Sequence, residues 1–167
     1  WSRVGGLVGH VVGGEVKNSY YSTGTVTATG KGSGGFIGTA AGGSVHDCYS
    51  TGTVSTTAYY GAGLIGAVGA SMTVADCYFS GTVSTTSHYG SGLIGQHEKG
   101  NLVVSKCYVT GNVAPTGSNA NYAGIVAHPA STTGNLEIKN CYVTGNITGG
   151  KRWSGGILGS PAANTVI

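Results

Sequence analysis

Residues 62–66, Ala-Gly-Leu-Ile-Gly, and residues 76–83, Asp-Cys-Tyr-Phe-Ser-Gly-Thr-Val, decide the fold because this pair of segments recurs along the chain. The second glycine of the first segment returns at positions 6, 35, 63, 92, 124 and 156, in steps of 29, 28, 29, 32 and 32 residues. The second segment returns at Cys48, Cys107 and Cys141. A fixed period in this range predicts a solenoid or a related repeat array.

Each repeat is expected to contain three strands and no helix. The apolar runs are short and are bounded by Gly, Ser, Thr or Asn. The first strand is the Gly-Leu-Ile-Gly segment, the second ends at Val45 or its equivalents, and the third runs from Cys107 to Val113 or its equivalents. Period-two alternation in residues 107–113 directs one set of side chains inward (Cys107, Val109, Gly111 and Val113) and the other outward (Tyr108, Thr110 and Asn112).

A repeat of about 29 residues with three strands closes naturally into a parallel β-helix, in which like residues stack about 4.8 Å apart. Right-handed winding is the default for parallel crossovers. We therefore expect an all-β fold and a single solenoid domain over residues 1–167, with about five full turns of 28–34 residues and a partial sixth that includes residues 161–167. The turns should begin near residues 5, 34, 62, 91, 123 and 155.

The first turn has one residue more than its counterparts between Val16 and Val26. A bulge would absorb this residue, with either Ser19 or Tyr20 in the Cys position. The longer loops of the fourth and fifth repeats belong on the rim, where solenoids bind partners.

Composition narrows the function classes. Only 8% of the 167 residues are charged, and no basic run is longer than Lys151-Arg152, whereas nucleic acid binding usually needs a clustered basic surface. No stretch approaches the roughly 18–20 apolar residues of a membrane span. The chain opens on a repeat without an initiator Met or signal peptide, which suggests a processed chain or a fragment. Low charge with abundant Gly, Ser, Thr and Tyr favours an extracellular or cell-surface location.

The two segments together resemble the GLUG repeat: Gly-Gly-Leu-Ile/Val-Gly, then Asn/Asp-Cys/Ser-Tyr-x-Thr-Gly-Asn/Thr-Val. This repeat occurs in bacterial surface proteins, large adhesins and non-catalytic regions of some immunoglobulin-A-cleaving metallopeptidases. The resemblance covers nearly the whole chain and implies a β-solenoid that serves as a stalk or adhesive module. It implies no catalytic residues. The His-Glu-x-x-His helix of those metallopeptidases has no counterpart, because His97-Glu98 is followed by Lys99-Gly100.

Four cysteines hold one position in successive repeats: Cys48, Cys77, Cys107 and Cys141. We favour a ladder of buried thiols that fills the core. Disulfides are the alternative, but in-register parallel side chains hold their Cβ atoms nearer 4.8 Å than the preferred distance of about 3.8 Å. Sulfur atoms in a line do not give the tetrahedral geometry of a zinc site.

Asp47 and Asp76 should stack about 5 Å apart, a spacing that suits calcium or the carboxylate pair of a retaining glycosidase. The next turns offer Lys106 and Asn140 instead, so a solvated corner is favoured. No metal site, cofactor or catalytic residue is expected from the histidines, which share a repeat position at most pairwise: His10, His46, His88, His97 and His128.

Two aromatic rows are expected. The first points outward by parity and contains Tyr49, Tyr78, Tyr108 and Tyr142, with Tyr20 or Tyr21 at its head. The second precedes the Gly-Leu-Ile-Gly segment and contains Tyr60, Tyr89, Tyr122 and Trp153. Such rows stabilise a parallel sheet through cross-strand contacts, and exposed aromatic rows also form carbohydrate- or protein-binding surfaces. Both roles stay open.

Hydroxyl side chains also form short ranks, at Thr25, Thr53 and Thr82 and two residues further on at Thr27, Ser55 and Ser84. Regular Thr ranks are typical of ice-binding solenoids, but these end at Asn112 and Ala114. Residues 146–148, Asn-Ile-Thr, fit the N-glycosylation acceptor pattern.

Three functions follow as hypotheses. The first is a non-enzymatic extracellular module, structural or adhesive, that contacts a glycan or a host surface protein. The second is a filament subunit that self-associates end to end, because neither end shows a polar cap. The open sixth turn of one copy would stack on residues 1–9 of the next copy and continue the solenoid. The third, a carbohydrate-active enzyme, is disfavoured because the five acidic residues do not cluster.

Overall fold

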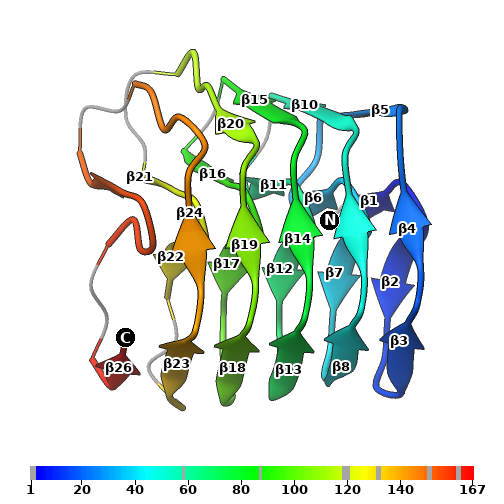
Figure 1. Ribbon diagram of the computed structural model, residues 1–167, viewed down its shortest axis with the longest axis vertical. Helices are drawn as coiled ribbons and strands as arrows, with labels where there is room; N and C mark the ends of the chain where they lie inside the picture. The colour runs from blue at the N-terminus through cyan, green and yellow to red at the C-terminus, as the bar shows by residue number, and fades with distance from the viewer. Residues whose placement is uncertain are drawn as a thin grey trace.

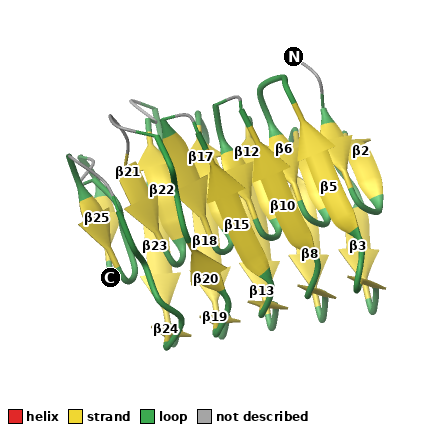
Figure 2. Ribbon diagram, turned by 90° about the horizontal axis from the view of Figure 1, so that it is seen from above, coloured by secondary structure: helices red, strands yellow, loops and turns green. Residues whose placement is uncertain are grey.

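The computed structural model describes residues 3–57, 59–86, 88–117, 121–130, 133–149, 152–160 and 163–167, and every regular element in these ranges is a strand. The chain winds into a β-solenoid of about five turns, which lie side by side along its axis (Figures 1 and 2). Residue 1 and residues 161–162 of the expected end segments lie outside these ranges.

Five parallel sheets run along the solenoid, labelled A to E in chain order. Sheet A contains β1 (Val4–Gly5), β6 (Ser33–Gly34), β11 (Gly61–Ala62), β16 (Tyr89–Ser91), β21 (Asn121–Ala123) and β25 (Ser154–Gly155). Sheet B contains β2 (Val8–Val11), β7 (Ile37–Ala40), β12 (Ile65–Val68), β17 (Ile94–His97) and β22 (Val126–Pro129). Sheet C contains β3 (Glu15–Lys17), β8 (Gly43–His46), β13 (Met72–Ala75), β18 (Leu102–Ser105), β23 (Leu136–Lys139) and β26 (Thr165–Val166).

The two remaining sheets come from the Cys-to-Val segment of each repeat. Sheet D, which faces the viewer in Figure 1, contains β4 (Tyr20–Tyr21), β9 (Tyr49–Ser50), β14 (Tyr78–Phe79), β19 (Tyr108–Val109) and β24 (Tyr142–Val143). Sheet E contains β5 (Thr25–Ala28), β10 (Thr53–Thr56), β15 (Thr82–Thr85) and β20 (Asn112–Val113).

The expectation of three strands per turn is therefore wrong, because two of the three segments bend in the middle. The Gly-Leu-Ile-Gly segment divides between sheets A and B, with Gly63 and Leu64 at the corner. The Cys-to-Val segment divides between sheets D and E, for example at Thr110 and Gly111. Because the chain turns at Leu64, both Leu64 and the adjacent Ile65 are fully buried.

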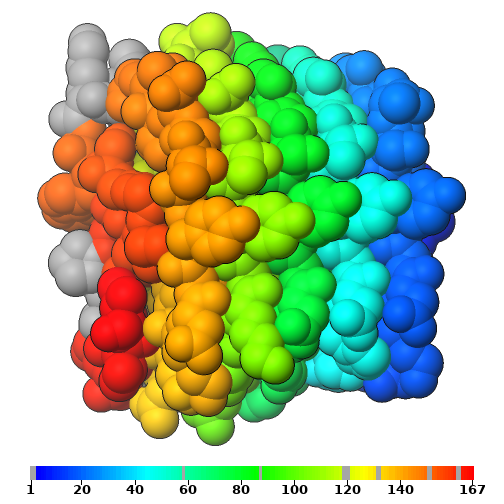
Figure 3. All heavy atoms as spheres, viewed as in Figure 1, coloured from blue at the N-terminus to red at the C-terminus, as the bar shows by residue number. Residues whose placement is uncertain are grey.

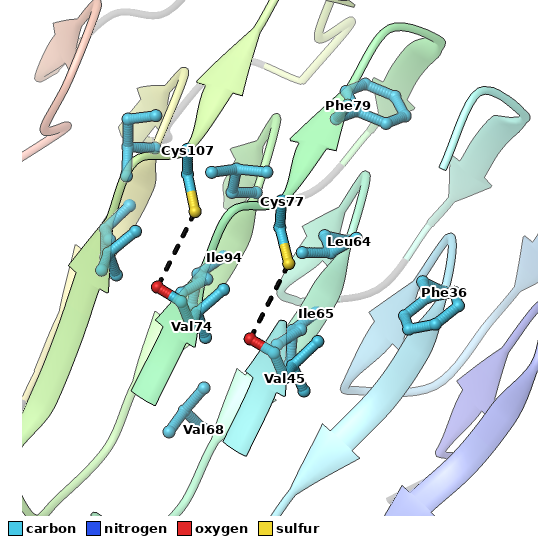
Figure 4. Close-up of a cluster of buried hydrophobic side chains, with 14 of the residues drawn as sticks. Phe36, Val45, Leu64, Ile65, Val68, Val74, Cys77, Phe79, Ile94 and Cys107 are labelled. Atoms are coloured by element: carbon cyan, nitrogen blue, oxygen red, sulfur yellow. Dashed lines mark hydrogen bonds between the residues drawn. The ribbon is translucent and has the colours of Figure 1, made fainter. Parts of the chain in front are cut away.

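The inward and outward sets of residues 107–113 are confirmed. Cys107, Val109 and Val113 are fully buried, whereas Thr110 and Asn112 are exposed. Corresponding side chains from every turn form one continuous apolar core, part of which is shown in Figure 4. The strands at the start of each turn pair in one register, with Gly5, Gly34, Ala62, Ser91, Ala123 and Gly155 in line.

The extra residue of the first turn lies between sheets D and E. Tyr20 pairs with Tyr49, so Ser19 takes the Cys position, while Thr25 pairs with Thr53. Thr23, in the intervening corner, adopts a left-handed backbone with φ of 62°. The insertion is thus accommodated without any change of register on either side.

A left-handed residue also marks the corner between sheets C and D in each of the first five turns. The φ angles lie between 50° and 54° for Asn18, Asp47, Asp76, Lys106 and Asn140. Asn and Asp tolerate this conformation because their short polar side chains bond locally, whereas most other L-residues are strained in it. The stacked aspartates of the sequence therefore have a conformational explanation.

Lys106→Asn is expected to stabilise the protein by about 0.5–1 kcal/mol, because Asn adopts the left-handed corner at lower cost than Lys. The ion pair that this change removes is weak, since Lys106 Nζ lies 4.0 Å from Asp76 Oδ1 and both side chains are largely exposed. Urea unfolding measures the difference. Lys139→Asn, on strand β23, is the control and should give no gain; equal effects at both positions would contradict the conformational explanation.

Candidate binding surface

The outward residues of sheet D form a continuous stack of five tyrosine rings. The ring centroids lie 4.7–5.1 Å apart and the ring planes differ by 2–6° along Tyr20, Tyr49, Tyr78, Tyr108 and Tyr142. The parallel register of sheet D fixes this spacing, because each tyrosine pairs with the tyrosine of the next turn. Figure 3 views this face of the molecule, on which the successive turns appear as parallel bands of colour.

The stacking decides which part of each ring is accessible. Within the row the ring faces cover one another, so the ring edges and hydroxyl groups meet the solvent. Among the described residues, Tyr20 stacks only on Tyr49 and Tyr142 only on Tyr108. These terminal rings are accordingly 58% and 52% exposed, whereas the three inner rings are half-buried. Burial has the largest effect on the pKa of Tyr78 and raises it, and the neighbouring phenols of Tyr49 and Tyr108 raise it further.

The second aromatic row differs from the expected one at Tyr122. Tyr60 and Tyr89 do stack, with their ring centroids 5.3 Å apart. Tyr122, however, pairs with Gly90 and is fully buried, while Asn121 occupies the position in register with Tyr89. The sequence contains a signal for this shift. Tyr60, Tyr89 and Trp153 each lie two residues before the aligned sheet A residue of their own turn (Ala62, Ser91 and Gly155), whereas Tyr122 lies only one residue before Ala123. Trp153 is 55% exposed.

A histidine completes this second row in place of Tyr122. His128 lies on β22, the sheet B strand of the fifth turn. Its ring centroid lies 4.1 Å from that of Tyr89, and the two ring planes differ by 14°. Burial lowers the pKa of His128, which keeps the imidazole neutral. His97 is buried as well, and its Nε2–H donates to the Gly100 carbonyl at 2.8 Å.

The thiol ladder has the expected place in the core. Cys48, Cys77 and Cys107 are buried and Cys141 is half-buried, and all four thiols are free. Each thiol donates to the carbonyl two residues earlier, at 3.1, 3.0, 3.2 and 3.3 Å for His46, Ala75, Ser105 and Lys139. Hydrogen bonds with the Cys107 and Cys48 thiols, and then burial, raise the pKa of Cys77. These interactions suit a structural role.

Two carboxylates pair with His46: that of Asp47 at the corner of the same turn, and that of Glu15 on the preceding turn. His46 Nδ1 lies 2.8 Å from Asp47 Oδ2, and its Nε2 lies 2.8 Å from Glu15 Oε1. Glu15 also pairs with Lys17 at 2.6 Å. The carboxylates of Glu15 and Asp47 therefore have basic partners on the solenoid. Among the described residues, no three His, Cys, Asp or Glu side chains converge as metal ligands would.

His46 is expected to titrate above its ordinary pKa of 6.5, because its imidazolium donates hydrogen bonds to Asp47, which has the larger effect, and to Glu15. Since the pKa is raised in the folded state, this contribution to stability is complete below pH 6.5 and is lost as the pH rises through the folded-state value. NMR titration of the ring protons measures the pKa. Asp47→Asn should lower it, and an unchanged value in that variant would contradict the assignment.

The hydroxyl ranks of sheet E are in register, with Thr25, Thr53 and Thr82 in one line and Thr27, Ser55 and Ser84 in the other. The first line continues with Asn112. Asn146, in the candidate glycosylation pattern, is exposed.

Comparison with known families identifies the repeat. A sequence model described as the GLUG motif matches residues 29–55, which confirms the resemblance. Comparison with curated proteins and with solved structures gives no match. Within the described ranges, no helix has the length and apolar character needed to cross a membrane. Residues 29–55 pair in register with the turns on either side, so the matched GLUG motif forms part of the β-solenoid.

Proposed function

We propose that the chain is a non-enzymatic structural and adhesive module of a secreted or cell-surface protein. The observation that carries this proposal is the tyrosine row of sheet D, five stacked rings on a rigid parallel sheet. Its partner would be a glycan chain or an extended segment of a host surface protein.

The row combines two roles that the sequence leaves open. Ring stacking stabilises sheet D, since aromatic neighbours on adjacent strands contribute roughly 0.2–1 kcal/mol per pair. The same stacking holds the hydroxyl groups in a line whose repeat is that of the sheet. A surface that is fixed in advance loses little conformational entropy on binding. Contacts in the middle of the row would use hydroxyl groups and ring edges, and a sugar ring would stack only on Tyr20 or Tyr142.

The acidic residues support a structural interpretation over an enzymatic one. Asp47 and Asp76 occupy the left-handed corner positions, and Asp47 and Glu15 bind His46. Glu137 pairs with Lys139 at 2.9 Å. A glycosidase would need a pair of carboxyl groups facing one substrate. End-to-end assembly into a filament stays a prediction, which electron microscopy across a concentration series tests.

A hydroxyl-deleted variant tests the adhesive role. Tyr49→Phe, Tyr78→Phe and Tyr108→Phe together keep the stacked rings and remove three hydroxyl groups. Wild-type protein is expected to bind members of a glycan array or a panel of host surface proteins, and the triple variant should bind them at least about tenfold more weakly, as the loss of one or two net hydrogen bonds predicts.

The matched control removes three hydroxyl groups from sheet E through Thr27→Ala, Ser55→Ala and Ser84→Ala. This variant should bind like the wild type. Thermal unfolding of both variants shows whether the solenoid is intact. If the wild type binds nothing in either panel, or if the phenylalanine variant binds equally well, the adhesive role is wrong and the row serves stability alone.

A further inference from the structure

A hollow on the outer side of sheet B arises where two rows of side chains meet. One row belongs to sheet B and is in register along His10, Thr39, Ala67, Gln96 and His128. The other row runs beside the starts of the sheet A strands: Arg3, Gly32 and Tyr60 immediately precede β1, β6 and β11, and Tyr89 is the equivalent first residue of β16. Each residue of this second row lies against sheet B of the following turn.

The glycines of sheet B show this offset. A β-carbon at Gly38 would lie 2.7 Å from the backbone of Arg3, and one at Gly66 would lie 2.7 Å from the backbone of Gly32. One at Gly95 would lie 3.0 Å from the backbone of Tyr60. Arg3 therefore overlies the second turn of sheet B, Gly32 the third and Tyr60 the fourth.

Side chains fill the space over the later turns and leave it open at the third. The Tyr60 hydroxyl bonds Gln96, and the Tyr89 ring covers His128. Gly32 offers no side chain, and Ala67 beneath it offers only a methyl group. The space that remains is a hollow of about 260 Å³, lined among others by Arg3, His10, Thr39, Ala67 and Glu98.

The polar groups of this hollow are arranged around an apolar floor. His10 Nδ1 lies 2.6 Å from Thr39 Oγ1, while Arg3 and Lys99 bring two cationic side chains. A β-carbon at Gly69 would lie 3.5 Å from Glu98 Oε2, so this carboxylate reaches back over the third turn. Among the described residues Glu98 has no ion pair within 4.0 Å, and burial raises its pKa. Both cationic side chains and a carboxylate thus line one hollow.

We propose that this hollow binds a single sugar-acid unit, a six-membered ring that carries both hydroxyl groups and a carboxylate. Arg3 and Lys99 would hold the carboxylate, because charge-assisted hydrogen bonds to carboxylates are the strong ones. Glu98 accepts hydrogen bonds when it is ionised and so requires hydroxyl donors from the ligand. The methyl group of Ala67, beneath Gly32, would face the C–H side of the ring. The volume lies just below the about 300–1,000 Å³ of drug-sized ligand pockets, which suits one ring.

NMR titration of the whole chain with sodium glucuronate tests the site. Saturable shifts of the His10 ring and of the Thr39 amide are expected, with a Kd of about 1–10 mM. Glucose, which lacks the carboxylate, and acetate, which lacks the hydroxyl groups, should each bind at least about tenfold more weakly. No saturation at about ten times the expected Kd, or equal binding of acetate and glucuronate, overturns the proposal.

Variants locate the binding in the hollow. Ala67→Gln places there the side chain that the next turn carries at the same register position, Gln96, and should abolish binding while the fold is kept. Arg3→Ala and Glu98→Gln should each weaken binding about tenfold. Thr73→Gln, exposed on sheet C, is the matched control and should bind like the wild type. Unchanged binding in Ala67→Gln overturns the proposal, and this result is independent of the tyrosine row because the two surfaces lie on different sheets.

Discussion

Gly63→Ala is expected to lower the free energy of unfolding by at least about 3 kcal/mol, a large share of the about 5–15 kcal/mol that holds a typical domain folded. A β-carbon at this corner would lie 2.3 Å from the carbonyl oxygen of Gly92 and 2.3 Å from the Phe79 ring. The carbonyl belongs to the backbone of the next turn and the ring is fully buried, so neither has room to move. Relief would require the third and fourth turns to separate at the corner between sheets A and B.

The repeat supplies a control at the same motif position. Gly156 is the equivalent glycine of the last repeat, and a β-carbon there would meet nothing within 4 Å. Gly156→Ala should therefore change stability by no more than about 0.5 kcal/mol. Urea unfolding, followed by circular dichroism, compares the two variants. Similar losses at both positions would show that the glycine is needed for its own backbone conformation, and not for the close approach of the next turn.

The sequence predicts most of the architecture because the repeat period and the side-chain parity are properties of the chain itself. Cys107 and Val109 lie inside and Thr110 lies outside as their alternation requires. The cysteine ladder and the first tyrosine row follow from the same alternation. Parallel pairing then stacks each residue on its equivalent, so the spacing of the tyrosine rings is a consequence of the backbone.

The remaining features depend on distances that no local pattern contains. The corners at Gly63 and Gly111 divide the expected strands because backbone torsions at a bend are set by packing against the next turn. Tyr122 is displaced inward by one residue because the preceding loop changes in length. The hollow arises from Gly32 and Ala67, which belong to different turns and are unremarkable in their own repeats. A search for small residues at facing register positions would have found it.

Phe79→Ala is expected to cost about 3–5 kcal/mol, the usual cost of truncating a buried phenylalanine. The inward row of sheet D contains Tyr21, Ser50, Phe79, Val109 and Val143, so Phe79 is its only large apolar side chain between Ser50 and Val143. Its neighbour Ser50 is small and fully buried, and its Oγ has no partner among the described residues. The ring lies against Gly63 of its own turn and Gly111 of the next, where a β-carbon would come within 2.3 and 2.9 Å of it, so its removal leaves a cavity between the third and fourth turns.

Hydrogen exchange shows how the loss is distributed. In a solenoid the stability is a sum of the turns and their nearest-neighbour interfaces. Removal of the ring should reduce amide protection in the second, third and fourth turns and leave the fifth turn less affected. Phe79→Leu, which retains most of the apolar volume, is the matched control and should cost less than half as much. A uniform loss of protection along the whole chain would contradict the nearest-neighbour description.

The double variant Gly63→Ala, Phe79→Ala separates the two clashes expected at the corner. Removal of the ring relieves one of the two contacts of the new β-carbon and leaves the contact with the Gly92 carbonyl. The two losses should therefore be less than additive, with a coupling energy of about 0.5–3 kcal/mol, as neighbouring residues that share a contact show. Full additivity would mean that the backbone contact alone excludes a side chain at Gly63, and that the glycine follows from the spacing of the turns whatever fills the core beside it.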